Sequence, residues 1–459
     1  MHPRKIDVYL HTQFREAVMR SYPHLRFRTG VRKQREVDRT RAHALTHGIS
    51  MNGKEKEQRD PRRVGNKTKR YVSDDDEKDR VPGAHAYVIL DKVGEGSFGI
   101  VYKARHRTKG RVFAIKQYKQ PQRSDGVDLS KIREGALLRD LSHRNVIKLE
   151  DVLFYHSPAG KGSTISLVFE YASIDLYGYI CQHLRRARLS RDSAPQQQGN
   201  TWRLSSSPSS SSVACIVPPY TIKSVLHQLC SGLAYLHRHG IIHRDIKPSN
   251  ILVTGEGPGI GCVKIADFGL ARIDQCPIRP ISENGIVVTI WYRAPELLLG
   301  SMYYNWAIDM WAVGCVLAEL IALRPVFEGK ETQDPKGFQH HQMKSIMAVV
   351  SPPTDLEKKL LKEMPLYHKA VESGVFDVQA GKAFATILNK FGKGLQNAML
   401  KSVMDHTLSL KVLLQSLWAF DPNARLSAEE ASRHDFFNEH PLPGENVFVP
   451  KEVVPGGVN

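Results

Sequence analysis

The sequence predicts an α+β protein of two lobes, a small β-rich lobe with one main helix followed by a larger, mainly helical lobe. Three short runs of β-forming residues are separated by glycines and charged turns, which is typical of a strand meander. These runs are residues 87–90, 99–102 and 112–116. Residues 128–141 place apolar side chains near helical spacing, and from Tyr220 onward most long segments keep this periodicity. We therefore expect the first lobe at 86–171 and the second at 172–437.

Three segments differ in composition from these lobes. Residues 1–85 are predicted to be a basic, disordered arm, because residues 1–80 hold 21 Lys and Arg against 12 Asp and Glu. The basic run 61–70 within the arm is either a nuclear-import signal or an ordinary solvated stretch. Residues 185–219, rich in Ser, Gln, Pro and Arg, are predicted to be a disordered insert in the second lobe. Residues 438–459 form a C-terminal tail.

Composition argues against several classes of protein. Hydrophobic residues make up 41% and charged residues 24% of the chain, as in globular proteins. The six cysteines contain no C-x-x-C pair, so neither a disulfide framework nor a zinc module is expected. The most apolar long stretch, 306–323, carries Asp309 and Glu319, whose burial in lipid would be costly. We therefore predict no membrane span.

A glycine-rich segment and a lysine suggest a phosphate site in the first lobe. Residues 94–101 have the spacing G-x-G-x-x-G-x-V, in which glycines let backbone N–H groups approach phosphate oxygens. Dinucleotide-binding folds share this spacing but continue into a helix, whereas residues 100–104 continue as a strand. Lys116 ends the next strand, where its ammonium can hold phosphates, and Glu134 on the following helix is its natural partner. Taken singly, each of these two residues would be read as a solvated surface charge.

Three further motifs follow in the second lobe. They are I-H-R-D-I-K-P-S-N at 242–250, A-D-F-G at 266–269 and A-P-E at 294–296. Together with the glycine loop and the strand lysine, the five motifs occur in the order found in eukaryotic protein kinases. The chain therefore resembles this family, over roughly residues 86–450, with the kinase domain expected at 86–437. The resemblance implies the bilobal protein kinase fold and an ATP-dependent phosphotransferase.

The resemblance also implies roles for individual residues. Asp245 would accept the proton of the substrate hydroxyl, and Lys247 would lie beside the transferred phosphoryl group. Lys116 would pair with Glu134. These roles agree with the chemistry, because phosphoryl transfer needs positioning and cations that face the developing negative charge.

ATP and Mg²⁺ are the cofactors that the resemblance implies. Asn250 and Asp267 would hold the Mg²⁺ ion, and backbone groups of Glu170 and Ala172 would contact adenine, which apolar side chains sandwich. The implied nucleotide-binding residues are Val93, Gly94, Glu95, Gly96, Gly99, Val101, Ala114, Lys116, Glu170, Ala172 and Leu252.

Supporting parts of the family pattern are present as well. Glu296 and Arg425 resemble the family's buried ion pair, and Asp309 resembles the carboxylate that braces the catalytic loop. Phe169 stands at the gatekeeper position before the hinge. Met310 and Trp311, beside Asp309, indicate that this helix is buried.

Two segments and an insertion narrow the resemblance. Residues 126–134 are similar to the cyclin-contacting helix of cyclin-dependent kinases, and residues 287–293 to their proline-directed substrate floor. Proline has no N–H, so a Ser/Thr-Pro substrate suits a site without a backbone acceptor at that position. Residues 253–259 are inserted between Asn250 and Asp267, as in the Mediator-associated, cyclin-C-dependent kinases of the cyclin-dependent kinase 8 type.

This narrower resemblance implies partners and a location. A cyclin, of C type, would bind the helix at 128–141, and subunits of the Mediator kinase module would assemble with the chain. Substrates would include proteins such as the RNA polymerase II C-terminal repeat. The expected location is the nucleus, with no membrane partner and no direct sequence-specific binding of nucleic acid.

The chain departs from the pattern in places. Animal members carry D-M-G where this chain has D-F-G at 267–269, and the insert at 185–219 is longer here. Asn284 occupies the position of the activating threonine, so Glu283 or a partner would neutralise the arginine cluster, with Ser282 as an off-register phosphate acceptor otherwise. The cluster comprises Arg133, Arg244 and Arg272. The alternatives are a cell-cycle or transcription-elongation kinase, and a catalytically dead scaffold.

Overall fold

A computed structural model describes most of the chain after the N-terminal arm. The described residues are 81, 84–95, 99–118, 134–135, 137–156, 163–192, 217–257, 259–273, 289–330, 337–350, 352–377 and 408–449. The chain divides into two units, Met1–His85 and Ala86–Asn459, and every element below belongs to the second unit. The predicted arm lies almost entirely outside the described residues.

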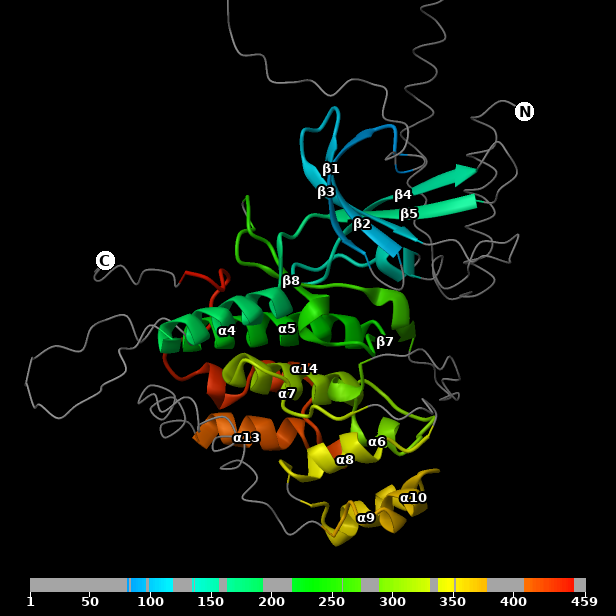
Figure 1. Ribbon diagram of the computed structural model, residues 1–459, viewed down its shortest axis with the longest axis vertical. Coiled ribbons are helices and arrows are strands. Elements are labelled where there is room, and N and C mark those ends of the chain that lie inside the picture. The colour runs from blue at the N-terminus through cyan, green and yellow to red at the C-terminus, as the bar shows by residue number, and fades with distance from the viewer. Residues whose placement is uncertain are drawn as a thin grey trace, which may run out of the picture. The chain divides into compact units, whose positions relative to one another are not determined.

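The first lobe is built on a five-stranded antiparallel sheet (Figure 1). Its strands are β1 (Tyr87–Glu95), β2 (Gly99–His106), β3 (Val112–Tyr118), β4 (Leu149–His156) and β5 (Ser163–Glu170). The strand order β1-β2-β3-β5-β4 joins the first three strands as consecutive hairpins, which confirms the predicted meander. On β3, Phe113 and Ile115 are buried on one face, so Ala114 and Lys116 lie on the other.

A helix precedes β4 and carries Glu134. Residues 134–135 and 137–139 are helical, which confirms this part of the helix predicted at 128–141; the remainder lies outside the described residues. Gly135 permits a close approach to β5, because an added Cβ would lie 3.3 Å from Leu167 Cδ2. Glycine has a low helix propensity, but at this position its missing side chain allows the helix to pack closely against β5.

The second lobe is mainly helical (Figure 1). Its helices are α4 (Leu176–Asp192), α5 (Pro219–Arg238), α6 (Pro295–Leu298), α7 (Ala307–Ala322), α8 (His340–Met347), α9 (Asp355–Leu361), α10 (Tyr367–Glu372), α13 (Leu408–Leu417) and α14 (Ala428–Ser432). Short 3₁₀ helices are η2 (Pro248–Asn250), η3 (Phe268–Leu270), η4 (Ile290–Tyr292), η5 (Pro422–Ala424) and η6 (Asp435–Phe437). These elements confirm the predicted two-lobed α+β architecture.

Short strands of the second lobe carry the loops of the candidate site. A three-stranded sheet has the order β6-β8-β9, and β7 pairs with β10. These strands are β6 (Ile174–Asp175), β7 (Ile241–Ile242), β8 (Ile251–Val253), β9 (Val263–Ile265) and β10 (Arg272–Ile273). Buried apolar residues of β7, β8 and β9 belong to the core and anchor the ends of these loops.

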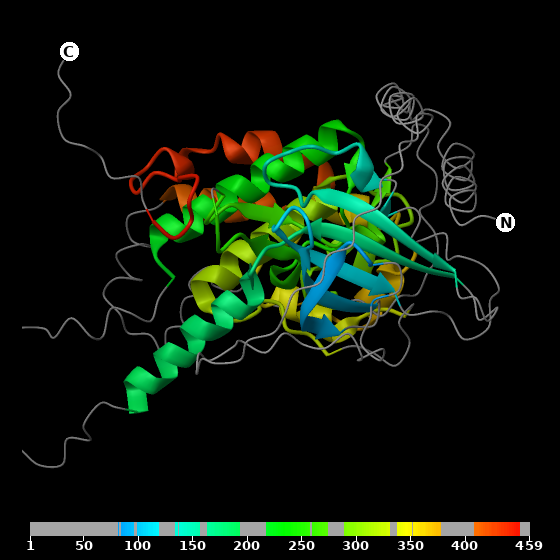
Figure 2. The same cartoon turned by 90° about the horizontal axis from the view of Figure 1, so that it is seen from above.

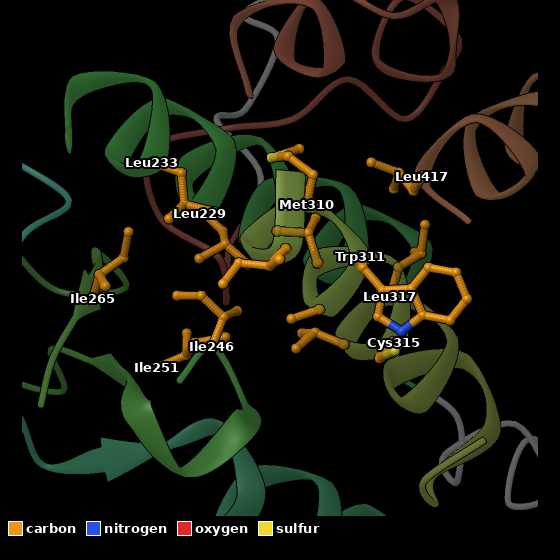
Figure 3. Packing of buried hydrophobic residues seen from close by; sticks show 14 of the residues in the cluster. Leu229, Leu233, Ile246, Ile251, Ile265, Met310, Trp311, Cys315, Leu317 and Leu417 are labelled. Carbon is orange, nitrogen blue, oxygen red and sulfur yellow. The ribbon is translucent and has the colours of Figure 1, made fainter. Parts of the chain in front are cut away.

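The core of the second lobe lies between α5, α7 and α13 (Figure 3). Apart from Asp309 and Glu319, helix α7 consists of apolar residues and glycine, and it is buried along almost its whole length, as predicted from Met310 and Trp311. Trp311 has no exposed surface and stacks on Phe327 with 5.8 Å between ring centroids. No helix in the described part of the chain is both long and apolar enough to cross a membrane.

Several helices begin where the sequence offers a start signal. Helices α9 and α14 have capping boxes, in which Thr354 pairs with Glu357 and Ser427 pairs with Glu430. Helix α5 begins at Pro219, whose missing N–H costs nothing in a first turn. Local sequence therefore determines these helix ends.

The predicted start of the disordered insert at residue 185 is wrong. Helix α4 continues to Asp192, and its last turns extend past the neighbouring helices (Figure 2). Arg, Leu and Ala at 184–189 are good helix formers, and the breakers begin only after Asp192. At the other end Val217 is fully buried in the core. Residues 193–216, between these points, lie outside the described residues.

The tail is docked on the second lobe as far as residue 449. Carbonyls of Asn446 and Val449 accept from Tyr220 Oη on α5 at 2.8 and 3.1 Å. The N–H of Val447 donates to the carbonyl of Gly261, which lies between the insertion and β9, at 3.0 Å. Gly261 is required there, because its φ is +74° and an added Cβ would collide with Asn446.

Candidate active site

The ammonium of Lys116 on β3 lies between two carboxylates. Its Nζ is 3.0 Å from Glu134 Oε1 and 2.8 Å from Asp267 Oδ1. Burial favours the neutral amine, but the two carboxylates outweigh it and raise the pKa of Lys116. Burial likewise tends to raise the pKa of Asp267, yet the ammonium of Lys116 keeps it below its usual value. Lys116 and Asp267 can therefore both remain ionised at neutral pH.

The phenol of Tyr118 belongs to this cluster, although the sequence analysis missed it. Its hydroxyl donates to Glu134 Oε2, and its ring centroid lies 5.2 Å from Lys116 Nζ. A signal was present in the sequence, because residues two apart on a strand share a face. Tyr118 follows Lys116 at that spacing.

The loop between β7 and η2 carries the second group of predicted residues. Lys247 Nζ lies 2.8 Å from Asp245 Oδ2. Asn250 Nδ2 donates to both the carbonyl and Oδ2 of Asp245, each at 2.8 Å. The carboxylate of Asp245 is only 8% exposed, so these two donors largely define its orientation. The structure thus brings all three predicted residues together.

Backbone contacts join this loop to the segment that carries Asp267. The N–H of Ala266 donates to the carbonyl of Asn250 at 2.9 Å, and His243 Nε2 lies 3.0 Å from the carbonyl of Ala266. Asp267 has a φ of +63°, a left-handed conformation that is rare for aspartate and typical of functional sites. The predicted metal ligands, Asn250 and Asp267, are therefore held on neighbouring backbones.

Asp309 on α7 accepts backbone N–H groups of the loop that carries Asp245. Its two oxygens accept the backbone N–H groups of His243 and Arg244 at 2.9 and 2.8 Å, and His237 Nε2 lies 3.0 Å from Oδ2. Burial tends to raise the pKa of Asp309, but the hydrogen bond from His237 and the other donors lower it. Arg244 has a φ of +70°, which these contacts stabilise. The bracing role expected for Asp309 agrees with this geometry.

The described part of the glycine loop is the hairpin of β1 and β2. Gly94 and Glu95 end β1 and Gly99 begins β2, which supports the hairpin interpretation over a strand-to-helix turn. Gly96 lies outside the described residues. An added Cβ at Gly99 would collide with the carbonyl of Gln117, so this glycine is needed for packing against β3.

The predicted adenine-contacting residues lie where the two lobes join. Val101, Ala114 and Leu252 are all partly buried on strands, and Val93 is 53% exposed. Glu170 Oε1 lies 2.8 Å from Lys264 Nζ and accepts the backbone N–H of Lys148 at 2.9 Å. The N–H of Glu170 donates to the carbonyl of Lys148.

The residues present fit a magnesium–nucleotide complex. Among the described residues no group of three or more His, Cys, Asp and Glu side chains could hold a metal ion alone. Asn250 uses its Nδ2 on Asp245, which leaves Oδ1 for a cation, and Asp267 has one oxygen beyond its contact with Lys116. One carboxylate and one amide oxygen are typical of Mg²⁺ that is bound chiefly through substrate phosphates and water.

The ion pair of Glu296 and Arg425 lies deep in the second lobe. The guanidinium donates to both carboxylate oxygens, at 2.6 and 2.7 Å, and the side chains are 2% and 0% exposed. Such a bidentate geometry is the favourable one for a buried pair. It joins the A-P-E segment to the segment before α14, as the family resemblance implied.

The predicted substrate floor is described from Thr289 onward. Trp291 Nε1 donates to the carbonyl of Gly329 at 2.9 Å, and Tyr292 Oη donates to Glu319 Oε2 at 2.7 Å. Residues 287–288 lie outside the described residues, as do Asn284 and Ser282. One contact to α7 and one to the segment that follows it therefore hold this floor in place.

Glu319 should make stability depend on pH. Burial raises the pKa of Glu319 to about 7, against an ordinary value of 4.5. A carboxyl with a raised folded-state pKa stabilises the protein at low pH, and this contribution is lost as pH rises through the folded value. The wild-type protein should therefore lose stability relative to Glu319→Gln between about pH 5 and 7, by at most about 1.4 kcal/mol per pH unit.

Urea denaturation of both proteins across this pH range measures the difference. Glu363→Gln, at an exposed glutamate, is the matched control and should run parallel to the wild type. A constant difference between the wild type and Glu319→Gln over the range would contradict the assignment.

Comparisons with known proteins agree with this geometry. The protein kinase domain family matches residues 87–437. Cyclin-dependent kinase E-1 of Arabidopsis thaliana is 40% identical over 375 residues, 81% of this chain and 70% of the relative. Cyclin-dependent kinase 8 of Drosophila melanogaster is 35% identical over 78% of this chain and 71% of the relative. Serine/threonine-protein kinase srb10 of Schizosaccharomyces pombe is 36% identical over 79% of this chain and 89% of the relative.

Proposed function

The chain belongs to the protein kinase family, among the cyclin-dependent kinases of the cyclin-dependent kinase 8 type, and from this premise we propose how its site works. It is a cyclin-dependent protein serine/threonine kinase that uses ATP and a divalent metal ion. The contacts of Lys116 with Glu134 and Asp267 are the observation that carries the proposed mechanism. An inactive scaffold has no need of this arrangement, which is costly to bury.

Asp245 orients the substrate hydroxyl and accepts its proton as the hydroxyl oxygen attacks the γ-phosphorus of ATP. The bond from this phosphorus to the β–γ bridging oxygen breaks, and ADP leaves. The nearly buried carboxylate, held by Lys247 and Asn250, supports this role because it offers a fixed acceptor. Lys247 then faces the phosphoryl group, where its positive charge offsets the charge that develops on the phosphoryl oxygens. Both residues lie on a loop that Asp309 braces, so neither has to be ordered during the reaction.

Lys116 contacts the phosphates of ATP, with Glu134 holding its ammonium. In the structure the ammonium contacts Asp267, so we propose that it moves from this carboxylate to the nucleotide phosphates when ATP binds. Asn250 and Asp267 hold Mg²⁺, which when bound supplies positive charge to the phosphates. The described catalytic centre then matches the needs of phosphoryl transfer, namely position and charge.

The adenine ring is proposed to lie between the lobes. Val101 and Ala114 cover it from the first lobe and Leu252 from the second, which is supported by their partly buried positions on strands. The N–H of Glu170 already donates to the carbonyl of Lys148. We therefore expect Glu170 to contact adenine through its carbonyl. Ala172, two residues further along the hinge, supplies the next backbone contact. The hairpin residues Val93, Gly94, Glu95 and Gly99, together with Gly96, cover the phosphates.

We further propose a place for the kinase in transcription. The name of the cyclin-dependent relative supports a cyclin on the helix at 128–141. The resemblance of the insertion at 253–259 to Mediator-associated kinases supports a C-type cyclin and association with Mediator kinase-module subunits. Ser/Thr-Pro sites, such as those of the RNA polymerase II C-terminal repeat, are the proposed substrates, and the nucleus is the proposed location. A cell-cycle or elongation kinase is the alternative, and co-purification of a different cyclin would favour it.

The isolated chain should be weakly active and should be switched on by its cyclin without activation-loop phosphorylation. Asn284 cannot accept a phosphate, so phosphatase treatment of the purified cyclin complex should leave its rate unchanged.

The assay compares a Ser-Pro peptide with a matched Ser-Ala peptide, which should be a poor substrate. High activity of the isolated chain would contradict cyclin dependence. A loss of rate after phosphatase treatment, traced to Ser282 or Thr289, would contradict the second expectation.

A further inference from the structure

Tyr118 contacts both members of the ion pair on which the kinase centre depends. Its hydroxyl donates to Glu134 Oε2, while Lys116 Nζ lies 3.0 Å from Glu134 Oε1 and 3.4 Å from Oε2. Two donors from one strand therefore hold the two oxygens of a single carboxylate. A carboxylate bound at both oxygens is restricted in rotation, whereas one donor alone would leave it free to turn.

The position of the hydroxyl is set by rigid structure. Tyr118 is 6% exposed and belongs to the same core cluster as Leu138 of the helix and Leu167 of β5. Its backbone pairs with Gly99 of β2, where the missing side chain allows close approach of the two strands. The sheet therefore fixes the backbone of Tyr118, and from this position its hydroxyl reaches the carboxylate of Glu134.

Packing does not explain the hydroxyl. A phenylalanine would fill the same space, and a buried hydroxyl is costly unless it has a partner. The partner here is the carboxylate of Glu134, whose residue is 3% exposed. As a neutral donor, the hydroxyl stabilises the carboxylate without adding a positive charge that would compete with Lys116 for phosphate.

We propose that Tyr118 is a positioning residue that holds Glu134 in the orientation required by Lys116. Less of the free energy that stabilises this orientation then has to come from cyclin binding. The proposal rests on the proposed function. The structure shows an inward position of the helix that carries Glu134, with the ion pair formed. The proposal supposes that the helix also has an outward position and that the cyclin binds only the inward one. The hydrogen bond from Tyr118 exists only in the inward position, so it shifts the population in the same direction as the cyclin.

This shift has a quantitative consequence. If the bond raises the inward population by some factor, the isolated chain gains activity by that factor. Its apparent cyclin affinity rises by the same factor, because the cyclin binds only the inward population. The rate at saturating cyclin changes little, since nearly all molecules are then inward. A residue that only stabilised the fold would change melting temperature without linking these two quantities.

The test compares Tyr118→Phe with the wild type in the full-length chain and its purified cyclin. We expect the rate of the isolated chain to fall several-fold, up to about tenfold, and the cyclin Kd to rise by the same factor. The rate at saturating cyclin should stay within about twofold of wild type. Tyr87→Phe is the matched control, because Tyr87 is equally buried in the same sheet and contacts His106 and Phe113 instead.

A double-mutant cycle separates this coupling from a general effect on folding. In Glu134→Ala the acceptor is gone, so adding Tyr118→Phe should leave the cyclin Kd unchanged, as measured by calorimetry without an activity assay. An equal loss of affinity in both backgrounds, or no change in Tyr118→Phe alone, would overturn the proposal. If the wild-type complex itself transfers no phosphate, the proposed function fails instead, and the binding data still report on Tyr118.

Discussion

Asp245→Asn is expected to lower the rate of phosphate transfer to a Ser-Pro peptide by about 10²–10⁴-fold. The amide has the same shape and can still accept from Lys247 and Asn250, so the loop should keep its conformation. What it loses is the basic oxygen that takes the hydroxyl proton. Nucleotide binding should therefore change little while the turnover number falls.

Steady-state kinetics with a separate measurement of ATP affinity checks this expectation. Asp355→Asn is the matched control, since this side chain on α9 is 97% exposed and should leave the rate at the wild-type level. Wild-type turnover by Asp245→Asn would refute the role of Asp245. Loss of ATP affinity with unchanged turnover would instead assign Asp245 to the nucleotide.

Arg425→Ala is expected to cost about 3–5 kcal/mol of folding stability. The guanidinium satisfies Glu296 and also donates to the carbonyls of Ala307 and Ala419, at 3.1 and 2.8 Å. Its removal leaves a carboxylate and two carbonyls buried without these donors. An uncompensated buried charge is among the most destabilising single changes in a protein.

Urea denaturation of the variant and the wild type measures this loss. Arg433→Ala is the matched control, because Arg433 pairs with Glu429 at 2.7 Å but is 74% exposed, and exposed pairs contribute only about 0–1 kcal/mol. Replacing both Glu296 and Arg425 by Leu should cost less than Arg425→Ala, since no charge then remains buried. If Arg425→Ala and Arg433→Ala lost equal free energies of unfolding, burial would not determine the contribution of the Glu296–Arg425 pair to stability.

Much of the candidate site was predictable because its residues lie within short motifs. The loop that contains Asp245, Lys247 and Asn250 spans six residues, and local spacing together with the family resemblance was enough to select them. The pairing of Lys116 with Glu134 was predicted from strand and helix positions 18 residues apart. Burial of α7 followed from the apolar residues Met310 and Trp311 beside Asp309.

Other features depend on contacts that no local pattern encodes. The direct contact of Lys116 with Asp267 joins residues 151 apart in sequence. Docking of the tail on α5 joins Tyr220 to Val449, 229 residues apart. The extension of α4 to Asp192 was missed for a different reason, because the composition of the whole insert obscured the helix-forming residues at its start.

The sequence by itself determined the two-lobed α+β class, the order of the motifs and the types of residue at the centre, since these depend on periodicity and short spacings. Only the tertiary structure decided that Tyr118 holds Glu134 and that Glu319 holds Tyr292. Neither pair is joined by a motif. The physical reason is that a hydrogen bond depends on distances of a few ångströms in space, and these arise only when separate strands and helices pack together.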